Sequence, residues 1–221
     1  MTRHVVIFAR APQAGRVKRR LADDIGAMAA ARFYRATLAR QIRQLSRDPR
    51  WTLWLFITPD NALTHPIWSA VCGMRRRPQG DGDLGWRMKL PFRLLPAGPV
   101  VLVGSDIPAL QPSHVARAFR LLGRLDLVFG PASDGGFWLI GARRLRPLPR
   151  DLFARVRWST SFALADTLAG IPARFSIGLA DTLDDVDDVA DLRRYFDGRR
   201  FSTSSSRRMA ANTGSQSPVV D

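Results

Sequence analysis

The chain of 221 residues contains very little cysteine and histidine, and each shortage excludes a class of protein. The single cysteine, Cys72, cannot form an internal disulfide and supplies no cysteine-rich metal site. The histidines, His4, His65 and His114, lie far apart and share no motif. The sequence therefore predicts neither a zinc centre nor a histidine-based catalytic triad.

Long apolar runs are also missing. Residues 4–9 (HVVIFA) are far too few for the core of a signal peptide or for a membrane span. Every other apolar run is interrupted well before it reaches membrane length. We therefore predict a cytoplasmic protein without a membrane span.

The charge balance is strongly basic, with a formal net charge of +15. A charge of this size invites a nucleic-acid-binding interpretation. However, only Lys18 and Lys89 are lysines, and the many arginines are scattered along the chain. We interpret this as a solvated basic surface that also attracts phosphorylated small molecules, and we do not expect a nucleic-acid partner. The oligomeric state is left open.

Apolar runs of strand length alternate with helical stretches. We expect strands at residues 4–9, 51–57, 100–103, 126–130, 137–140 and 174–177, and helices at 18–46, 61–73, 86–95, 112–122, 159–169 and 187–196. This alternation predicts an α/β fold in which helices cover both faces of a mostly parallel sheet. The loop at 131–136 is too short for a parallel crossover, so a bend or an antiparallel insertion is expected there.

The length suits one domain, and the composition changes after Arg200. Beyond that residue, serine, threonine, alanine and glycine dominate, and no periodicity remains. We predict one ordered domain over residues 1–198 and a disordered tail rich in serine and arginine over residues 199–221.

Polar segments stand where the predicted strands end, which is where open α/β sheets bind ligands. In ARAPQAGRVKRRL (9–21), Gly15 allows close backbone approach and Lys18 begins a predicted helix. Backbone N–H groups and Lys18 would form an anion site, although an ordinary strand–helix loop is the alternative. In VVLVGSDIP (100–108), the apolar strand delivers Asp106 at its tip. A divalent cation would offset the cost of burying that carboxylate; the alternative is a turn cap before Pro108.

Two further segments carry acids. In GPASDGGFWLIG (130–141), Asp134 stands in a glycine-rich turn between two apolar strands, and it would converge with Asp106 if the strands are neighbours. The alternative is a structural Asp-Gly turn. In GDGDLGWRM (80–88), Asp81 and Asp83 lack the spacing of an EF-hand. That segment is interpreted as a lid, an acceptor loop or a plain surface loop.

Six motifs occur in order: FARAP-x-x-GRVK-x-RL, QG-x-GDLG-x-RM, GSD-x-P-x-L, GPA-x-DGG-x-x-LIG, WST and DVD-x-x-x-DL. Together they resemble a bacterial family of glycosyltransferase-A-like proteins, some labelled arsenosugar biosynthesis glycosyltransferase. The family is similar in fold to the guanylyltransferases of molybdenum-cofactor and phospholactate metabolism. The resemblance covers about residues 4–196. It implies a single-domain, Rossmann-like nucleotide-diphospho-sugar transferase (GT-A) fold, a mostly parallel sheet with an antiparallel insertion.

The resemblance also implies roles for individual residues. Asp106 would hold a divalent cation, Mg²⁺ or Mn²⁺, and Asp134 would be an acceptor-side or second metal-side acid. For the catalytic base that an inverting transfer needs, our candidate is Asp134. Asp185 and Asp187 match the DVD motif, for which helix capping is the simpler interpretation; the N-cap of the C-terminal helix is expected at Asp187 or Asp188. The nucleotide- and phosphate-binding residues would be Ala11, Pro12, Gly15, Arg16, Lys18 and Ser105. The acceptor-side residues would be Asp83, Gly135, Gly136, Trp158 and Ser159.

The chain departs from the family pattern at several positions. The family usually has Thr where Arg19 stands, Glu where Trp86 and Ser133 stand, and a Tyr pair at residues 137–138. These differences indicate either an altered acceptor specificity or a weakened activity.

We predict a transferase, namely a metal-dependent glycosyltransferase that moves a sugar from a nucleotide-diphosphate donor to a small-molecule acceptor. Nucleotidyl transfer from a nucleoside triphosphate to a small phosphorylated acceptor would use the same loop, metal and fold. A non-catalytic nucleotide-binding protein is the third alternative, motivated by Arg19, Trp86 and Ser133.

Overall fold

Seven strands form one mixed sheet in the computed structural model, which describes residues 1–64, 68 and 74–197. The strands are β1 (His4–Arg10), β2 (Thr52–Thr58), β3 (Arg75–Pro78), β4 (Val100–Gly104), β5 (Leu127–Pro131), β6 (Phe137–Ala142) and β7 (Ile177–Leu179), in the order β3-β2-β1-β4-β6-β5-β7. Only β6 is antiparallel to its neighbours, β4 and β5. All other pairs are parallel. The prediction of a mostly parallel sheet with an antiparallel insertion is confirmed.

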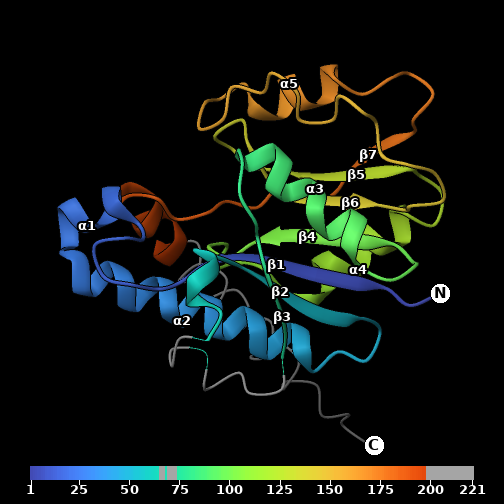
Figure 1. Cartoon of the computed structure of the whole chain (residues 1–221). Coiled ribbons are helices and arrows are strands. Elements are labelled where there is room, and N and C mark those ends of the chain that lie inside the picture. The colour runs from blue at the N-terminus through green and yellow to red at the C-terminus, as the bar shows by residue number, and fades with distance from the viewer. Residues whose placement is uncertain (65–67, 69–73, 198–221) are drawn as a thin grey trace, which may run out of the picture.

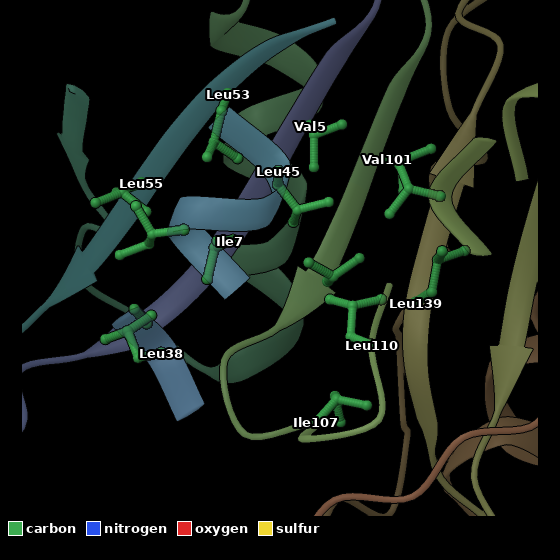
Figure 2. Close-up of a cluster of buried hydrophobic side chains, with 14 of the residues drawn as sticks. Val5, Ile7, Leu38, Leu45, Leu53, Leu55, Val101, Ile107, Leu110 and Leu139 are labelled. Atoms are coloured by element: carbon green, nitrogen blue, oxygen red, sulfur yellow. The ribbon is translucent and has the colours of Figure 1, made fainter. Parts of the chain in front are cut away.

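Helices cover both faces of the sheet, as predicted. They are α1 (Arg19–Ile25), α2 (Ala27–Ser46), α3 (Leu84–Leu94), α4 (Pro112–Leu121) and α5 (Ala163–Ala169), with a 3₁₀ turn η1 at Asp60–Ala62 and helical residues at 189–197. Alternate residues of β1 point to opposite faces. Val5 and Ile7 pack with α2 and α4, whereas Val6 packs with side chains of α3 and α5. Figure 2 shows the first of these cores, where Leu38 and Leu45 of α2 lie over the strands.

The long helix predicted over residues 18–46 is divided into α1 and α2. Gly26 separates them with φ +84°, a left-handed conformation that no residue inside a right-handed helix adopts. Its N–H bonds to the carbonyl oxygen of Ala22 at 2.9 Å and so ends α1. The composition of this stretch favoured a helix throughout, but the single glycine decided the local backbone.

Other boundaries also differ from the predictions. β3 was not predicted, because its sequence RRRP is polar and the strand lies at the edge of the sheet, where no buried face is required. The helix predicted from residue 159 begins only at Ala163, since Ser159 has φ +61°. The last strand lies at 177–179 instead of 174–177. Of the helix predicted over 61–73, residues 60–62 form a 3₁₀ turn, and most of the remainder lies outside the described residues, as does the tail at 199–221.

The carboxyl ends of β1 and β4 point towards α1 and the C-terminal segment, which lie side by side in Figure 1. A small apolar cluster explains this contact: Leu21 of α1 and Ala30 of α2 pack against Val186, with Val189 and Leu192 at its border. This cluster brings residues 185–187 to the edge of the sheet where ligands bind in this type of fold. No helix in the described ranges is long and apolar enough to cross a membrane.

Candidate active site

Three aspartates meet beyond the carboxyl end of β4. Asp106 follows that strand, whereas Asp185 and Asp187 come from the segment that packs on α1. One carboxylate oxygen from each residue lies within 4.8 Å of the other two. Their side chains are 30%, 30% and 45% exposed, respectively, so a ligand in the adjoining space would reach them. We refer to Asp106, Asp185 and Asp187 as the acid triad.

Lys18 lies among these carboxylates. Its Nζ is 2.6 Å from Asp106 Oδ2, 2.6 Å from Asp187 Oδ1 and 3.9 Å from Asp185 Oδ2, and its side chain is only 4% exposed. The backbone of Lys18 has φ +48°, which is strained for a residue with a side chain. Strain of this kind costs about 1–3 kcal/mol and persists where the surroundings over-determine it. Here two short ion pairs fix the side chain.

The pKa values show that the acid triad holds more negative charge than Lys18 neutralises. Burial opposes the charge on Lys18, but attraction to Asp106 and Asp187 outweighs it and raises the pKa of the ammonium group. Burial, together with repulsion from Asp106 and Asp187, raises the pKa of Asp185 to about 7. The pKa of Asp187 is lowered, because attraction to Lys18 exceeds the opposing effect of burial. A further cation would stabilise the ionised form of Asp185.

The acid triad fits a hard divalent cation. Carboxylate oxygens are the ligands that Mg²⁺ and Mn²⁺ prefer, and Mg²⁺ usually completes its shell with phosphate oxygens and water. Of the three acids, only Asp106 was predicted as a metal ligand. The capping interpretation of Asp185 and Asp187 is corrected, because Asp188 is the residue that caps the C-terminal helix, accepting the Asp191 N–H at 2.9 Å. The sequence feature that could have indicated a joint role for Asp185 and Asp187 is their i, i+2 spacing in DVD, which places two side chains on one side of an extended segment.

A cleft of about 650 Å³ opens beside the acid triad, within the size range of small-molecule sites. Its cationic lining consists of Arg10, Arg16, Lys18, Arg19, Arg20 and Arg87. A neighbouring recess of about 350 Å³ follows the loop after β1 and adds Ala11 and Gly15. Of the predicted nucleotide-binding residues, Ala11, Gly15, Arg16, Lys18 and Ser105 therefore line one of these two spaces. Pro12 is buried and lines neither.

Two buried polar side chains hold the cationic wall in place. The Tyr34 hydroxyl donates to the carbonyl oxygen of Arg10 at 3.0 Å and lies 2.8 Å from Ser105 Oγ; burial raises its pKa to about 12. The Gln79 amide donates to the carbonyl oxygens of Ala9 and Phe56, and its Oε1 accepts from Arg87 Nη1 at 3.1 Å. Neither Tyr34 nor Gln79 was predicted as a site residue, although Gln79 and Arg87 belong to the QG-x-GDLG-x-RM motif.

A second cavity of about 190 Å³ adjoins the cleft at the acid triad. Asp106, Asp134 and Asp185 contribute its acids, and no lysine or arginine from the described residues lines it. Its remaining lining is aromatic, aliphatic or neutral and polar: Leu84, Met88, Gly104, Ile107, Ala132, Gly136, Phe137, Trp138, Trp158, Ser159, Thr160 and Ala163. The predicted convergence of Asp106 and Asp134 is therefore seen in the geometry. We refer to this space as the acidic cavity.

The DGG and WST motifs form one wall of the acidic cavity. Gly135 has φ +84°, and a Cβ there would lie 2.1 Å from the carbonyl oxygen of Ser161. The carbonyl oxygen of Gly135 accepts the Leu164 N–H at 3.0 Å. Only glycine permits this approach, and it fixes Asp134 beside Ser159. Asp83, by contrast, caps α3 by accepting the Trp86 N–H at 2.7 Å and lines neither the cleft nor the acidic cavity.

A single α/β domain with this sheet order, and with cationic and acidic walls at the carboxyl ends of its strands, defines a protein of the nucleotide-diphospho-sugar transferase-like (GT-A) fold class. The predicted fold class is thus confirmed. Within that class, the chain belongs to the family described as "uncharacterized protein conserved in bacteria (DUF2064)", which matches residues 41–160. No curated protein sequence matches the chain.

Several solved structures are similar to this chain in fold. The chain is 30% identical to a protein of Desulfovibrio desulfuricans G20 that is provisionally assigned as a nucleotide-diphospho-sugar transferase; the match covers 87% of this chain and 85% of the other, with a TM-score of 0.77. Rv0371c of Mycobacterium tuberculosis H37Rv (16% identity, 89% and 98% coverage, TM-score 0.52) shares the fold. So does CMP:2-keto-3-deoxy-manno-octonic acid synthetase complexed with CTP (12%, 93% and 100%, 0.54). The first of these names describes a transferase and the third a complex with a nucleotide, and Rv0371c has also been crystallised with manganese.

Proposed function

We propose that this protein is a metal-dependent glycosyltransferase that moves a sugar from a nucleotide-diphosphate donor to a hydroxyl group of an uncharged small acceptor. One observation carries the proposal: six cations line the cleft, whereas acids and aromatic side chains but no described cation line the acidic cavity that adjoins it. A donor with a diphosphate and an acceptor without phosphate match this division. The likeness to the Desulfovibrio protein supports the same donor class.

On the donor side, the cleft provides cations for a diphosphate. Arg16, Arg19 and Arg20 belong to the loop and helix that follow β1, where backbone N–H groups also favour anions. Arg87 reaches the cleft from α3 and is oriented by Gln79. Lys18, held at the boundary between the diphosphate region and the acid triad, would counter the charge of the departing nucleoside diphosphate.

On the acceptor side, the acidic cavity disfavours phosphate. A nucleotidyltransferase needs cations there to bind a phosphorylated acceptor, and the described lining provides none. Trp158 and Phe137 offer flat apolar surfaces against which a sugar or other ring would pack. For this reason we favour glycosyl transfer over nucleotidyl transfer.

The reaction breaks the bond between the anomeric carbon and the diphosphate oxygen and forms a bond from that carbon to the acceptor oxygen. The acceptor hydroxyl must lose its proton, and Asp134 is the proposed base. Its Oδ1 accepts the Gly136 N–H at 2.8 Å, and within the described part of the chain its Oδ2 accepts no hydrogen bond. The Oδ2 atom is thus available to receive the proton.

Asp106, Asp185 and Asp187 would hold the divalent cation. When bound, this ion supplies a Lewis acid that stabilises the negative charge of the leaving nucleoside diphosphate. In exchange, Lys18 would be released from part of its pairing with the acid triad and would turn towards phosphate. Asp187 and Asp106 thus have a cationic partner whether or not the ion is present.

The test compares two reactions under identical conditions. The protein is incubated with Mn²⁺, a panel of nucleotide-diphosphate sugars and uncharged hydroxyl acceptors, and release of nucleoside diphosphate is measured. In parallel, nucleoside triphosphates and phosphorylated acceptors are tested for release of pyrophosphate. We expect only the first reaction. Pyrophosphate release alone would establish nucleotidyl transfer, and tight binding of nucleotide sugars with neither product would establish a non-catalytic binding protein.

A further inference from the structure

The outward face of α3 combines apolar side chains with cations and takes no part in the cleft. At about 100° per residue, Trp86, Lys89 and Arg93 fall within about 60° of one another around the helix. Trp86 is 50% exposed. The side of α3 that faces the sheet buries Met88 and Phe92, and α3 lies in front of that sheet in Figure 1.

The segment after β6 completes this surface. Leu145, 60% exposed, and the cations Arg146 and Arg150 face α3 across a groove of about 550 Å³. We call this surface the α3 patch; it consists of Trp86, Lys89, Arg93, Leu145, Arg146 and Arg150. Among the described residues that line the groove there is no carboxylate. Arg146 pairs with Asp126, whereas Arg93 and Arg150 form no salt bridge within the described ranges.

Hydrogen bonds hold the two walls of the groove together. Arg144 donates to the carbonyl oxygens of Leu95, Pro96 and Gly98 at 2.7, 2.8 and 3.0 Å, which ties the segment to the end of α3. Lys89 Nζ donates to the carbonyl oxygen of Arg150 at 2.9 Å. The Arg93 guanidinium lies 5.5 Å from the centre of a Trp86 ring. These hydrogen bonds hold the two walls of the groove against each other.

We propose that the α3 patch docks the protein on the surface of an anionic lipid bilayer. Trp and Leu side chains enter the interface, while Lys and Arg keep their charged ends at the lipid phosphates. A nucleic acid would match the cations but would leave Trp86 and Leu145 exposed to water. Leu84 and Met88, on the inner side of α3, line the catalytic cleft, so docking through the outer side holds the cleft close to the bilayer.

The test measures binding of the full chain to vesicles. Phosphatidylcholine vesicles are compared with vesicles that contain about 30 mol% phosphatidylserine, in about 0.1 M and about 0.5 M salt. We expect tighter binding to the anionic vesicles, weakened by salt. Because each surface cation contributes roughly a factor of five, the pair Arg93→Gln and Arg150→Gln should weaken binding about 10- to 30-fold. The pair Trp86→Gln and Leu145→Gln should also weaken it.

The matched control lies on α2, which covers the other face of the sheet. Met28, Arg32 and Arg35 are exposed there, and changing all three to Gln should leave vesicle binding unchanged. The proposal is overturned if anionic vesicles are not preferred, or if both patch variants bind vesicles as the unmodified protein does. It is equally overturned if the arginine variant loses binding to a short DNA duplex but not to vesicles.

Discussion

The wall of the cleft formed by the loop after β1 and by α1 carries Arg16, Arg19 and Arg20, whereas the wall formed by residues 132–136 and 158–160 carries no cation. Both walls stand at the same edge of the same sheet. Apart from Arg87 of α3, the cationic wall comes from one continuous stretch of sequence. The acidic wall is assembled from segments far apart in the chain, and close backbone contacts hold it together. The acid triad and Lys18 lie at the junction of these two walls.

We expect the largest effect on activity from replacing Asp106, the acid of the triad that follows β4. Asp106→Asn keeps the size of the side chain but removes a negative charge from the acid triad, so the metal is held less tightly. We expect sugar transfer to fall about 10³-fold, a typical cost for losing an electrostatic contribution in the transition state. Transfer assays with Mn²⁺, together with a thermal melt to verify folding, measure this.

Asp188→Asn is the matched control for that variant. Asp188 belongs to the same acidic stretch as Asp187, but it caps the C-terminal helix, and Asn is an equally good cap. Transfer should be nearly unchanged. If Asp106→Asn were as active as Asp188→Asn, the acid triad would have no catalytic role.

The acidic wall should be the more fragile of the two in stability. Gly135→Ala adds a methyl group 2.1 Å from the carbonyl oxygen of Ser161 at φ +84°. Gly26→Ala has the same φ but nothing within 4 Å of its Cβ. Gly26→Ala should therefore cost about 1 kcal/mol of unfolding free energy, and Gly135→Ala about 1–3 kcal/mol more, measured by urea denaturation. Equal costs would show that the DGG and WST segments are not packed as described.

The two walls also differ in how well the sequence predicts them. The loop after β1 was identified because Gly15, Arg16 and Lys18 are close in sequence and follow an apolar strand. The position of Asp106 followed from the rule that ligands bind at strand ends. The sequence favoured helix capping for Asp185 and Asp187 because a helix does begin nearby. Only the packing of Val186 against Leu21 shows where the pair points, and a contact so distant in sequence has no local signal.

The sequence also predicted some parts of the fold and missed others. The strands with continuous apolar runs were predicted within a few residues, because burial on both faces dictates their composition. The polar edge strand β3 carried no such signal. The positioning residues Tyr34 and Gln79 were missed because a buried polar side chain is identified by its partners, and those partners belong to other strands and helices.

Lys18 lies at the junction of the two walls, and replacing it should have opposite effects on the affinity for nucleoside diphosphate and on the affinity for Mn²⁺. Lys18→Met removes the cation that would face the diphosphate, so affinity for nucleoside diphosphate should fall about 10- to 100-fold, as for the loss of a charge-assisted hydrogen bond. The same change leaves Asp106 and Asp187 without their ammonium partner, so Mn²⁺ should bind more tightly than to the unmodified protein. Calorimetric titrations with each ligand separate the two effects.

Lys89→Met provides the control, because Lys89 is the only other lysine and lies on the outer side of α3. Neither affinity should change in that variant. If both affinities fell in Lys18→Met, Lys18 would act as a structural support for the whole site, and the distinction between the walls at this residue would be lost.

The smallest expected effect is the pH dependence of the acid triad. The raised pKa of Asp185, about 7, means that the folded protein without metal retains a proton that the unfolded chain releases near pH 4. Stability without metal should therefore decrease as the pH rises from about 4 to about 7, and Asp185→Asn should reduce that dependence. Mn²⁺ competes with the same proton, so its affinity should increase over this range and level off above about pH 7. Melting temperatures measured with and without Mn²⁺ at a series of pH values test both pH dependences. If stability without metal and Mn²⁺ affinity changed with pH in the same direction, Asp185 would be excluded as the shared site of proton and metal.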